Sequence, residues 1–289
     1  MSGAVRPGRV ETITAHSNPR IKAIRALAQK KVRDREDRFL AEGEKLAHDA
    51  LAGGWTIHTL LHAREADGDA PERTARLADL AAKVRARGGD ILTVPPKLLA
   101  AVTRRDNPQA VVSVVGRRLT PVADLTPTAG ETWLALDRVR DPGNLGTCLR
   151  TADALGIAGV VLVGDCTDPF SLEAVRATMG SLFHVRLSQV AAKGFEGLAH
   201  RFRAAGGRVL ATHLEGAADL READWGAGPV LAVMGNEQQG LDPALAPACD
   251  GFLRIPMAGQ ADSLNLAVAT GITLFEARRA GLSGTGGGS

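Results

Sequence analysis

The 289-residue sequence lacks the features that define several protein classes. No apolar run approaches the roughly 18 residues of a membrane span, and the N-terminus has no apolar core typical of a signal peptide. Its three cysteines, Cys148, Cys166 and Cys249, are far apart and form no CxxC pair, so we predict neither a zinc site nor a disulfide framework. We interpret them as reduced and mostly buried, and we expect a cytoplasmic protein.

Two nucleotide-binding motifs are also missing. A nicotinamide dehydrogenase needs G-x-G-x-x-G after its first strand, with an acid about 20 residues further on, whereas residues 143–146 supply only G-x-x-G. A kinase-like NTPase needs a P-loop, which is absent. The composition, 45% hydrophobic and 23% charged, is instead that of a soluble globular protein of about two domains.

Charge is divided unevenly along the chain. Residues 1–130 hold 22 Lys and Arg against 15 Asp and Glu, which gives a formal charge of +7. Residues 131–281 hold 13 against 17, which gives −4. The N-terminal half is therefore the better candidate for binding a polyanion.

Residues 1–118 alternate helix and strand patterns and predict a small α/β domain. Basic side chains in residues 20–38 surround an apolar stripe, which predicts an amphipathic helix with a basic flank. The stripe consists of Ile21, Ile24 and Leu27. The flank has two interpretations, a solvated helix surface or a surface that binds a polyanion.

Residues 131–281, after a linker at 119–130, repeat strand and helix patterns and predict a parallel, three-layer α/β domain. In its last helix we expect Ser263 as the N-cap and one buried face with apolar residues at i, i+4, i+8 and i+11. That face consists of Leu264, Val268, Ile272 and Phe275. The Gly/Ser-rich tail at 282–289 is expected to be flexible.

Three strand-to-helix corners in this domain carry glycine and amide side chains. They are Asp141–Arg150, Val233–Leu241 and Leu253–Asn265. A glycine-bearing turn or a helix start offers free backbone groups that can hold a ligand, although the corner Leu253–Asn265, taken alone, favours the ordinary polar N-terminus of a C-terminal helix. Their ordered motifs are Asn-x-Gly-x-x-x-Arg, Gly-Asn-Glu-x-x-Gly-Leu and Ile-Pro-Met-x-Gly-x-x-x-Ser-Leu-Asn. This set closely resembles the three motifs of the SpoU/TrmH family of RNA ribose 2′-O-methyltransferases.

The resemblance implies a fold that pattern alone does not give. Strand and helix order predicts an open Rossmann-like sheet, whereas the family's SPOUT domain, here 131–281, has a deep trefoil knot. The family often carries an N-terminal RNA-binding domain similar to ribosomal protein L30e, which we place at residues 1–118. Family members are homodimers, and we expect the same here.

The resemblance also implies a reaction. We expect methyl transfer from S-adenosylmethionine, without a metal, to a ribose 2′-hydroxyl in structured RNA, with 23S ribosomal RNA favoured because of the added N-terminal domain. Two alternatives stay open: a tRNA ribose 2′-O-methyltransferase, and a non-catalytic RNA-binding protein on the same scaffold. The presence of Arg150, Glu237, Ser263 and Asn265 together favours the enzyme.

The family's cofactor contacts correspond to Gly235, Ile255 and Leu264, with Thr212 nearby at the end of a predicted strand. Glycine allows close approach to a ligand, and the two apolar residues offer walls and main-chain polar groups. Without the motifs, Ile255 and Leu264 would be interpreted as core residues.

The predicted catalytic group is Arg150, with Asn144, Glu237, Ser263 and Asn265 around it. A guanidinium effectively keeps its proton in a protein, so we expect Arg150 to align the hydroxyl or bind the adjoining phosphate. The alternatives are a surface arginine, a helix-start carboxylate for Glu237 and a simple N-cap for Ser263.

Four basic residues are predicted to contact RNA: Arg20, Lys22, Arg104 and Arg105. The last two lie in a loop similar to one of the family's N-terminal domain, and they could equally be surface cations. The sequence departs from the family pattern at Gln238, where glycine is common, and in the run Thr178–Ser181. Gln238 is expected to narrow the RNA side of the pocket.

Overall fold

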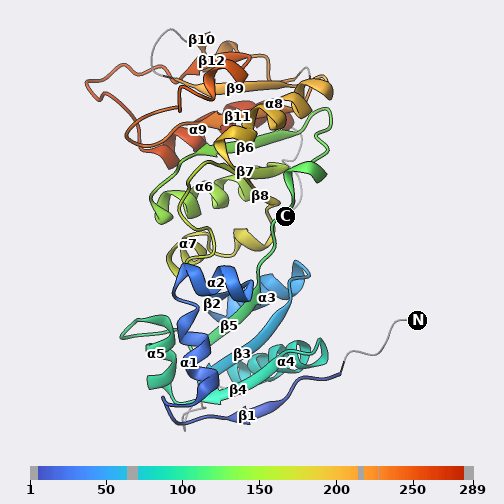
Figure 1. Cartoon of the computed structure of the whole chain (residues 1–289), viewed down its shortest axis with the longest axis vertical. Coiled ribbons are helices and arrows are strands. Elements are labelled where there is room, and N and C mark those ends of the chain that lie inside the picture. The colour runs from blue at the N-terminus through green and yellow to red at the C-terminus, as the bar shows by residue number, and fades with distance from the viewer. Residues whose placement is uncertain (1–5, 64–70, 214–217, 227, 283–289) are drawn as a thin grey trace. The chain divides into compact units, whose positions relative to one another are not determined.

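The computed structural model describes most of the chain, namely residues 6–63, 71–213, 218–226 and 228–282. The tail predicted at 282–289 lies outside these residues, apart from Leu282. The chain divides into two compact α/β units, which confirms the predicted fold class (Figure 1). The first unit contains residues 1–118 and 168–184, and the second contains 119–167 and 185–289. None of the helices in the described residues is long and apolar enough to cross a membrane.

The first unit is built on a five-stranded mixed sheet with the order β1-β4-β3-β5-β2. Its strands are β1 (Val10–Thr12), β2 (Arg38–Glu42), β3 (Ile57–Ala63), β4 (Asp90–Val94) and β5 (Val111–Gly116). Its helices from this part of the chain are α1 (Pro19–Ala26), α2 (Lys30–Glu36), α3 (Glu44–Ala52), α4 (Pro71–Ala86) and α5 (Pro96–Thr103). β5 runs antiparallel to both β2 and β3, while β3, β4 and β1 are parallel.

The prediction of a single basic helix at residues 20–38 is wrong. The structure has two short helices, α1 and α2, followed by strand β2. Asp37 ends α2 in the left-handed conformation at φ 51°, and its carbonyl accepts a hydrogen bond from Arg117 N–H at 2.9 Å. Phe39, which follows, is fully buried against the sheet. Tertiary pairing with β5 therefore decides the conformation of this segment.

Residues 168–184, expected in the second domain, belong to the first unit. They include α7 (Leu172–Ala177) and two aromatic residues, Phe170 and Phe183. The Phe170 ring lies 5.0 Å from that of Phe39, and the Phe183 ring lies edge-on to Trp55 at 5.3 Å. Trp55 also donates its indole N–H to the Phe183 carbonyl at 3.1 Å. These rings make the segment part of the first unit's core.

Two ion pairs hold the same segment to the first unit. Arg33 donates from Nε to Asp168 at 2.8 Å, and its Nη1 donates to the carbonyls of Leu27 and Ala28. The two charged side chains are only 6% and 9% exposed. Arg176 donates from Nε to the buried Glu42 at 2.6 Å. Because the charges of Arg33, Asp168 and Glu42 are removed from water, each of these three depends on its partner.

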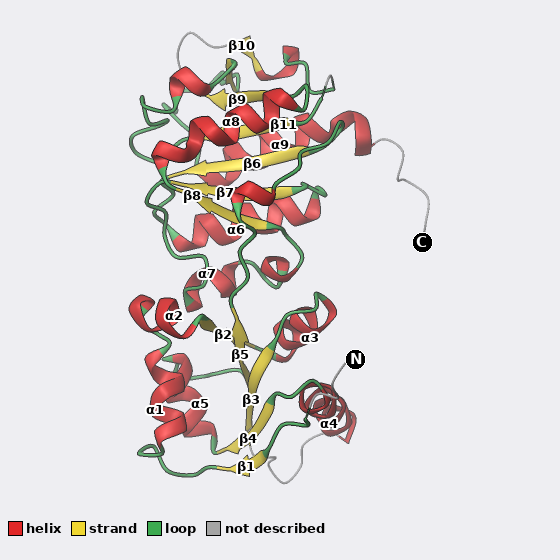
Figure 2. Ribbon diagram, turned by 45° about the vertical axis from the view of Figure 1, so that its right-hand side comes forward, coloured by secondary structure: helices red, strands yellow, loops and turns green. Residues whose placement is uncertain are grey.

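The second unit is a three-layer domain around a seven-stranded, all-parallel sheet with the order β10-β12-β9-β11-β6-β7-β8. Its strands are β6 (Thr132–Asp137), β7 (Gly159–Val163), β8 (Leu187–Val190), β9 (Arg208–Thr212), β10 (Ala218–Asp219), β11 (Val230–Met234) and β12 (Gly251–Arg254). Its α-helices among the described residues are α6 (Pro142–Ala154), α8 (Phe195–Ala204) and α9 (Leu266–Leu282). α8 covers one face of the sheet, and α6 packs beside α9 on the other (Figure 2).

The prediction of which face of the last helix is buried is wrong. Val268, Ile272 and Phe275 are 52%, 39% and 55% exposed, and Leu264 precedes α9 and is exposed as well. The buried side of α9 is formed by Leu266, Ala267, Thr270, Thr273 and Leu274. Apolar periodicity identified a real stripe on this helix, but the stripe faces outward within one chain.

The buried ion pair between Arg33 and Asp168 predicts that Asp168→Ala destabilises the first unit. The substitution leaves the Arg33 guanidinium buried without its carboxylate, which costs about 3–5 kcal/mol. The matched control is Asp79→Ala in the same unit, because Asp79 pairs with Lys83 at 2.6 Å but is 55% exposed and should contribute less than about 1 kcal/mol. Urea unfolding followed by tryptophan fluorescence, to which Trp55 of the first unit contributes, measures both. Equal, small effects of the two substitutions would contradict this account of residues 168–184.

Candidate functional site

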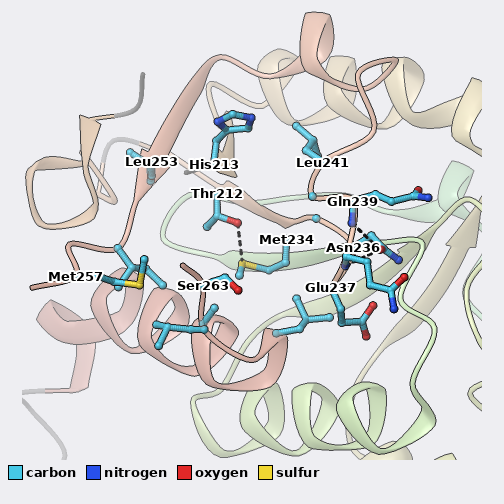
Figure 3. Close-up of a pocket in the computed structure, with 17 residues that line it drawn as sticks. Thr212, His213, Met234, Asn236, Glu237, Gln239, Leu241, Leu253, Met257 and Ser263 are labelled. Carbon is cyan, nitrogen blue, oxygen red and sulfur yellow. Dashed lines mark hydrogen bonds between the residues drawn. The ribbon is translucent and has the colours of Figure 1, made fainter. Parts of the chain in front are cut away.

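A cavity of about 420 Å³ opens at the carboxyl ends of β9, β11 and β12. Ligands of parallel α/β sheets bind at this edge, because the loops that leave the strands converge there. All four residues predicted to hold the cofactor line the cavity, together with two of the predicted catalytic residues (Figure 3). The first group is Thr212, Gly235, Ile255 and Leu264, and the second is Glu237 and Ser263.

The loop after β11 forms a whole wall of the cavity, with every residue from Gly235 to Leu241 in the lining. Asn236 and Gly240 exchange two backbone hydrogen bonds of 2.8 and 3.0 Å, and Gly240 has a φ of 66°. A Cβ at Gly235 would lie 2.3 Å from the Leu241 nitrogen. Gly235 is therefore required by the close approach of the loop's own backbone, which differs from the ligand approach predicted for it.

The opposite wall is apolar. Leu264 and Met257 are 37% and 41% exposed, and Ile255 lies beside them in the lining. Thr212 is half-buried at the end of β9 and donates its hydroxyl to the Val233 carbonyl at 3.3 Å. Apolar walls with a few fixed polar groups are typical of small-molecule sites.

One side-chain cluster joins the three motifs. Asn144 donates from Nδ2 to Glu237 Oε1 at 3.2 Å, and Asn265 donates from Nδ2 to Asn144 Oδ1 at 3.1 Å. The Arg140 N–H makes a longer contact of 3.4 Å to the other oxygen of Glu237. Asn144 itself is placed by Asp141, the N-cap of α6, which accepts from the Asn144 N–H at 2.6 Å.

Asn265 has the capping role that the sequence assigned to Ser263. Its Oδ1 accepts hydrogen bonds from the N–H groups of Ala267 and Val268 at 2.9 and 3.4 Å, at the start of α9. Ser263 lies two residues earlier and lines the cavity instead. The helix begins later than predicted because the asparagine side chain provides the cap.

Arg150 lies apart from this cluster within one chain. It is exposed on α6, six residues after Asn144, and is absent from the lining of the cavity. Six residues turn a helix through about 240°, so the two side chains leave different faces. Among the described residues no ion pair of Arg150 is found, and its guanidinium is open to a partner from outside the chain.

The four predicted RNA contacts differ in their surroundings. Arg20 is bound by acidic groups of its own unit, donating to Glu11 at 2.9 Å and to Asp90 at 2.5 Å. Lys22, Arg104 and Arg105 are exposed, and no ion pair of theirs is found in the described part of the chain. The latter three are therefore better placed than Arg20 to meet a phosphate.

Several lining residues were not predicted, namely His213, Met234, Asn236, Gln239 and Met257. Their positions in the sequence could have identified them, because each lies at the carboxyl end of a predicted strand or in the loop that follows it. Gln238, where the family pattern has glycine, is exposed and also lines the cavity.

The cysteines are free, as predicted. Cys148 is fully buried and contacts the Thr270 hydroxyl at 3.5 Å, and burial raises the pKa of its thiol to about 12. Cys166 and Cys249 are only partly buried, and burial raises each pKa to about 11. All three thiols are therefore protonated at neutral pH, which makes them poor nucleophiles.

Comparison with known proteins relates both units to RNA modification. The family model described as SpoU rRNA Methylase family matches residues 131–275, and the MRM3-like substrate binding domain matches 18–113. A crystal structure of an AdoMet-bound rRNA methyltransferase from Sinorhizobium meliloti is 51% identical, with a TM-score of 0.86 over 94% of this chain and 99% of that one.

Two curated relatives also match over most of their length. The 23S rRNA (guanosine(2553)-2′-O)-methyltransferase RlmP of Bacillus subtilis is 31% identical over 93% of this chain and 100% of its own. A 23S rRNA (uridine(2479)-2′-O)-methyltransferase of Streptomyces viridochromogenes is 32% identical over 89% and 88%.

The cluster predicts a pH-dependent effect of Asn144→Asp. The new carboxylate keeps its bond from Asn265 but faces Glu237, and like charges raise the carboxyl pKa values above their unfolded values near 4. The substitution should therefore destabilise the protein at pH 7, by about 1 kcal/mol, and the cost should disappear as the pH falls to about 4.

Thermal unfolding at both pH values measures this effect, with the exposed Asn107→Asp as the matched control. A loss of stability that is the same at both pH values would show that Asn144 and Glu237 do not interact as described.

Proposed function

The chain belongs to the SpoU rRNA methylase family, and we propose that it methylates a ribose 2′-hydroxyl of 23S ribosomal RNA with S-adenosylmethionine. One observation carries the proposal. The four residues predicted to hold the cofactor line one cavity, and Glu237 connects that cavity to Asn144 and Asn265. Asn144, Glu237 and Asn265, one from each motif, thus belong to one hydrogen-bonded cluster beside the cavity.

The cavity fits the proposed cofactor. Its volume of about 420 Å³ is within the usual range for small-molecule sites. Ile255, Leu264 and Met257 offer apolar surface to an adenine ring, while the Thr212 hydroxyl and the backbone of Gly235–Leu241 offer polar groups. S-adenosylmethionine supplies an electrophilic methyl group when bound. We propose that no metal takes part.

The chain's own residues position the acceptor. We assign Asn144 and Asn265 to orient the ribose, because their amides are fixed by Glu237 and by the cap of α9. Arg150 cannot accept the hydroxyl proton, since a guanidinium stays charged in proteins, and we propose that the proton passes to water. Arg150 lies away from the cavity within one chain, so we propose that it reaches the phosphate beside the reacting ribose, and the negative charge on the oxygen, only in the dimer.

RNA recognition is assigned to the first unit. The relevant cations are Lys22, Arg104 and Arg105, which are exposed, and the family model of a substrate binding domain matches this region. The two curated relatives act on a guanosine and on a uridine, so the proposal extends to the RNA and the ribose and leaves the base open.

Assembly into a homodimer is proposed from α9. Its stripe of Val268, Ile272 and Phe275 is exposed within one chain, and an apolar stripe of this kind is typical of a surface that binds a second protein. A second copy would cover it by two-fold symmetry. We also propose a cytoplasmic location, where the ribosomal RNA substrate is found. The trefoil knot stays a prediction.

The proposed role of Arg150 predicts a loss of rate without a loss of cofactor binding. Arg150→Ala should lower methylation by about 10²–10³-fold, because one charge-stabilising group is removed, and it should leave S-adenosylmethionine affinity nearly unchanged. The substrate is 23S ribosomal RNA from cells without the gene, and 2′-O-methyl mapping identifies the product. The exposed Arg221→Ala is the control. Methylation of a base, or normal turnover in Arg150→Ala, would reject the respective assignments.

The exposed stripe predicts that Phe275→Glu, alone or with Ile272→Glu, converts a dimer to a monomer. A carboxylate that is buried at such an interface loses its hydration. Light scattering should give close to twice 30.2 kDa for the unmodified chain and 30.2 kDa for the variant. Val10→Glu, at another exposed apolar residue, is the control. A monomeric unmodified chain would rule out the dimer.

A further inference from the structure

Arg138 has an unusual backbone position directly after β6. Its φ of 49° lies in the left-handed region, which residues other than glycine adopt uncommonly. Its N–H donates to the Val163 carbonyl at 3.0 Å, and its own carbonyl accepts from Asn236 Nδ2 at 2.7 Å. A residue persists in such a conformation when its surroundings determine it from several sides.

The Arg138 side chain contacts the loop Gly235–Leu241, which also contains the Asn236 side chain that binds the Arg138 carbonyl. Nε donates to both oxygens of Asp137, at 3.0 and 3.2 Å, and Asp137 is fully enclosed. This pairing fixes the guanidinium, whose Nη1 donates to Gln239 Oε1 at 2.9 Å and whose Nη2 donates to the Gly240 carbonyl at 3.2 Å. Hydrogen bonding to Asp137 also raises the pKa of Arg138, so its charge is permanent.

Asp137 extends this contact to the end of the loop. Its Oδ2 accepts the Asp242 N–H at 2.8 Å. Asp137, the last residue of β6, and Arg138, which follows it, therefore both bind this loop. Their hydrogen-bond partners in the loop are Asn236, Gln239, Gly240 and Asp242. The bound loop is the wall Gly235–Leu241 of the cavity, although neither Asp137 nor Arg138 lines the cavity.

We propose that Arg138 is a positioning residue that sets the affinity of the cavity for S-adenosylmethionine by holding the loop Gly235–Leu241 in its binding conformation. The inference rests on the proposed function of that cavity. An arginine is required because its planar fork reaches an acid, an amide and a carbonyl at once, whereas a lysine presents a single flexible charge.

Substitution of Arg138 should weaken cofactor binding and leave the chemical step intact. If the free loop keeps its binding conformation for about 1–10% of the time, Arg138→Ala raises the Kd of S-adenosylmethionine about 10- to 100-fold. The kcat at saturating cofactor should stay within about twofold. Arg138→Gly should behave like Arg138→Ala, although glycine removes the backbone strain, and Arg138→Lys should recover little.

Arg203→Ala is the matched control. Arg203 makes similar bonds in the same unit, to Asp250 at 2.7 Å and to the Ala248 carbonyl at 2.8 Å, and it holds a turn outside the cavity lining. Calorimetry gives the Kd of each variant, and methylation of 23S ribosomal RNA gives kcat and KM. If Arg138→Ala does not fold, Arg138→Lys provides the same comparison.

Amide hydrogen exchange of the ligand-free protein separates this inference from the proposed function. Exchange at Asn236 and Gly240, whose N–H groups bond across the loop, should accelerate in Arg138→Ala and stay normal in Arg203→Ala. If the unmodified chain does not bind S-adenosylmethionine, the proposed function fails. Amide exchange then still tests whether Arg138 holds the loop Gly235–Leu241 in place. Unchanged cofactor affinity in folded Arg138→Ala, or an equal loss in Arg203→Ala, overturns the inference.

Discussion

Parallel strand direction is the constraint on which the second unit depends. Because all seven strands run the same way, their carboxyl ends form one edge, and consecutive strands are joined by long crossovers, except for the short connection from β9 to β10. The loops after β9, β11 and β12 converge on the cavity for this reason, and α6 begins beside it after β6. The crossover between β7 and β8 has a further role, since it includes residues 168–184 of the first unit.

The amide content of the motifs follows from the geometry of this edge. Asn144 must accept from Asn265 and donate to Glu237 in the same cluster. An amide does both without adding charge, whereas a carboxylate cannot donate when ionised and a cation cannot accept. Glu237 thus has neutral neighbours that satisfy its oxygens while Asn265 remains able to cap α9.

The resemblance to the family's motifs predicted part of the cavity lining, including Gly235, Ile255 and Leu264, because glycine and amide residues define loops locally and the strands between them place those loops at one edge. It did not predict His213 or Met257, which also line the cavity. Tertiary relations were not predictable in the same way. The stripe on α9 is periodic whichever way it faces, so the sequence could not show that Val268 and Phe275 point outward. Strand β2 and residues 168–184 depend on partners far along the chain. Arg138 was not predicted because its partners Gln239 and Gly240 are about 100 residues away in the sequence.

The discontinuous first unit has a consequence for the chain during its synthesis on the ribosome. Domains generally fold as units, with the N-terminal one first as the polypeptide emerges. In this chain, Phe39 and Trp55 cannot make their ring contacts until Phe170 and Phe183 have been synthesised. Arg33 likewise cannot form its ion pair until Asp168 has been synthesised. The strands β6 and β7 are therefore synthesised before the first unit can complete its core.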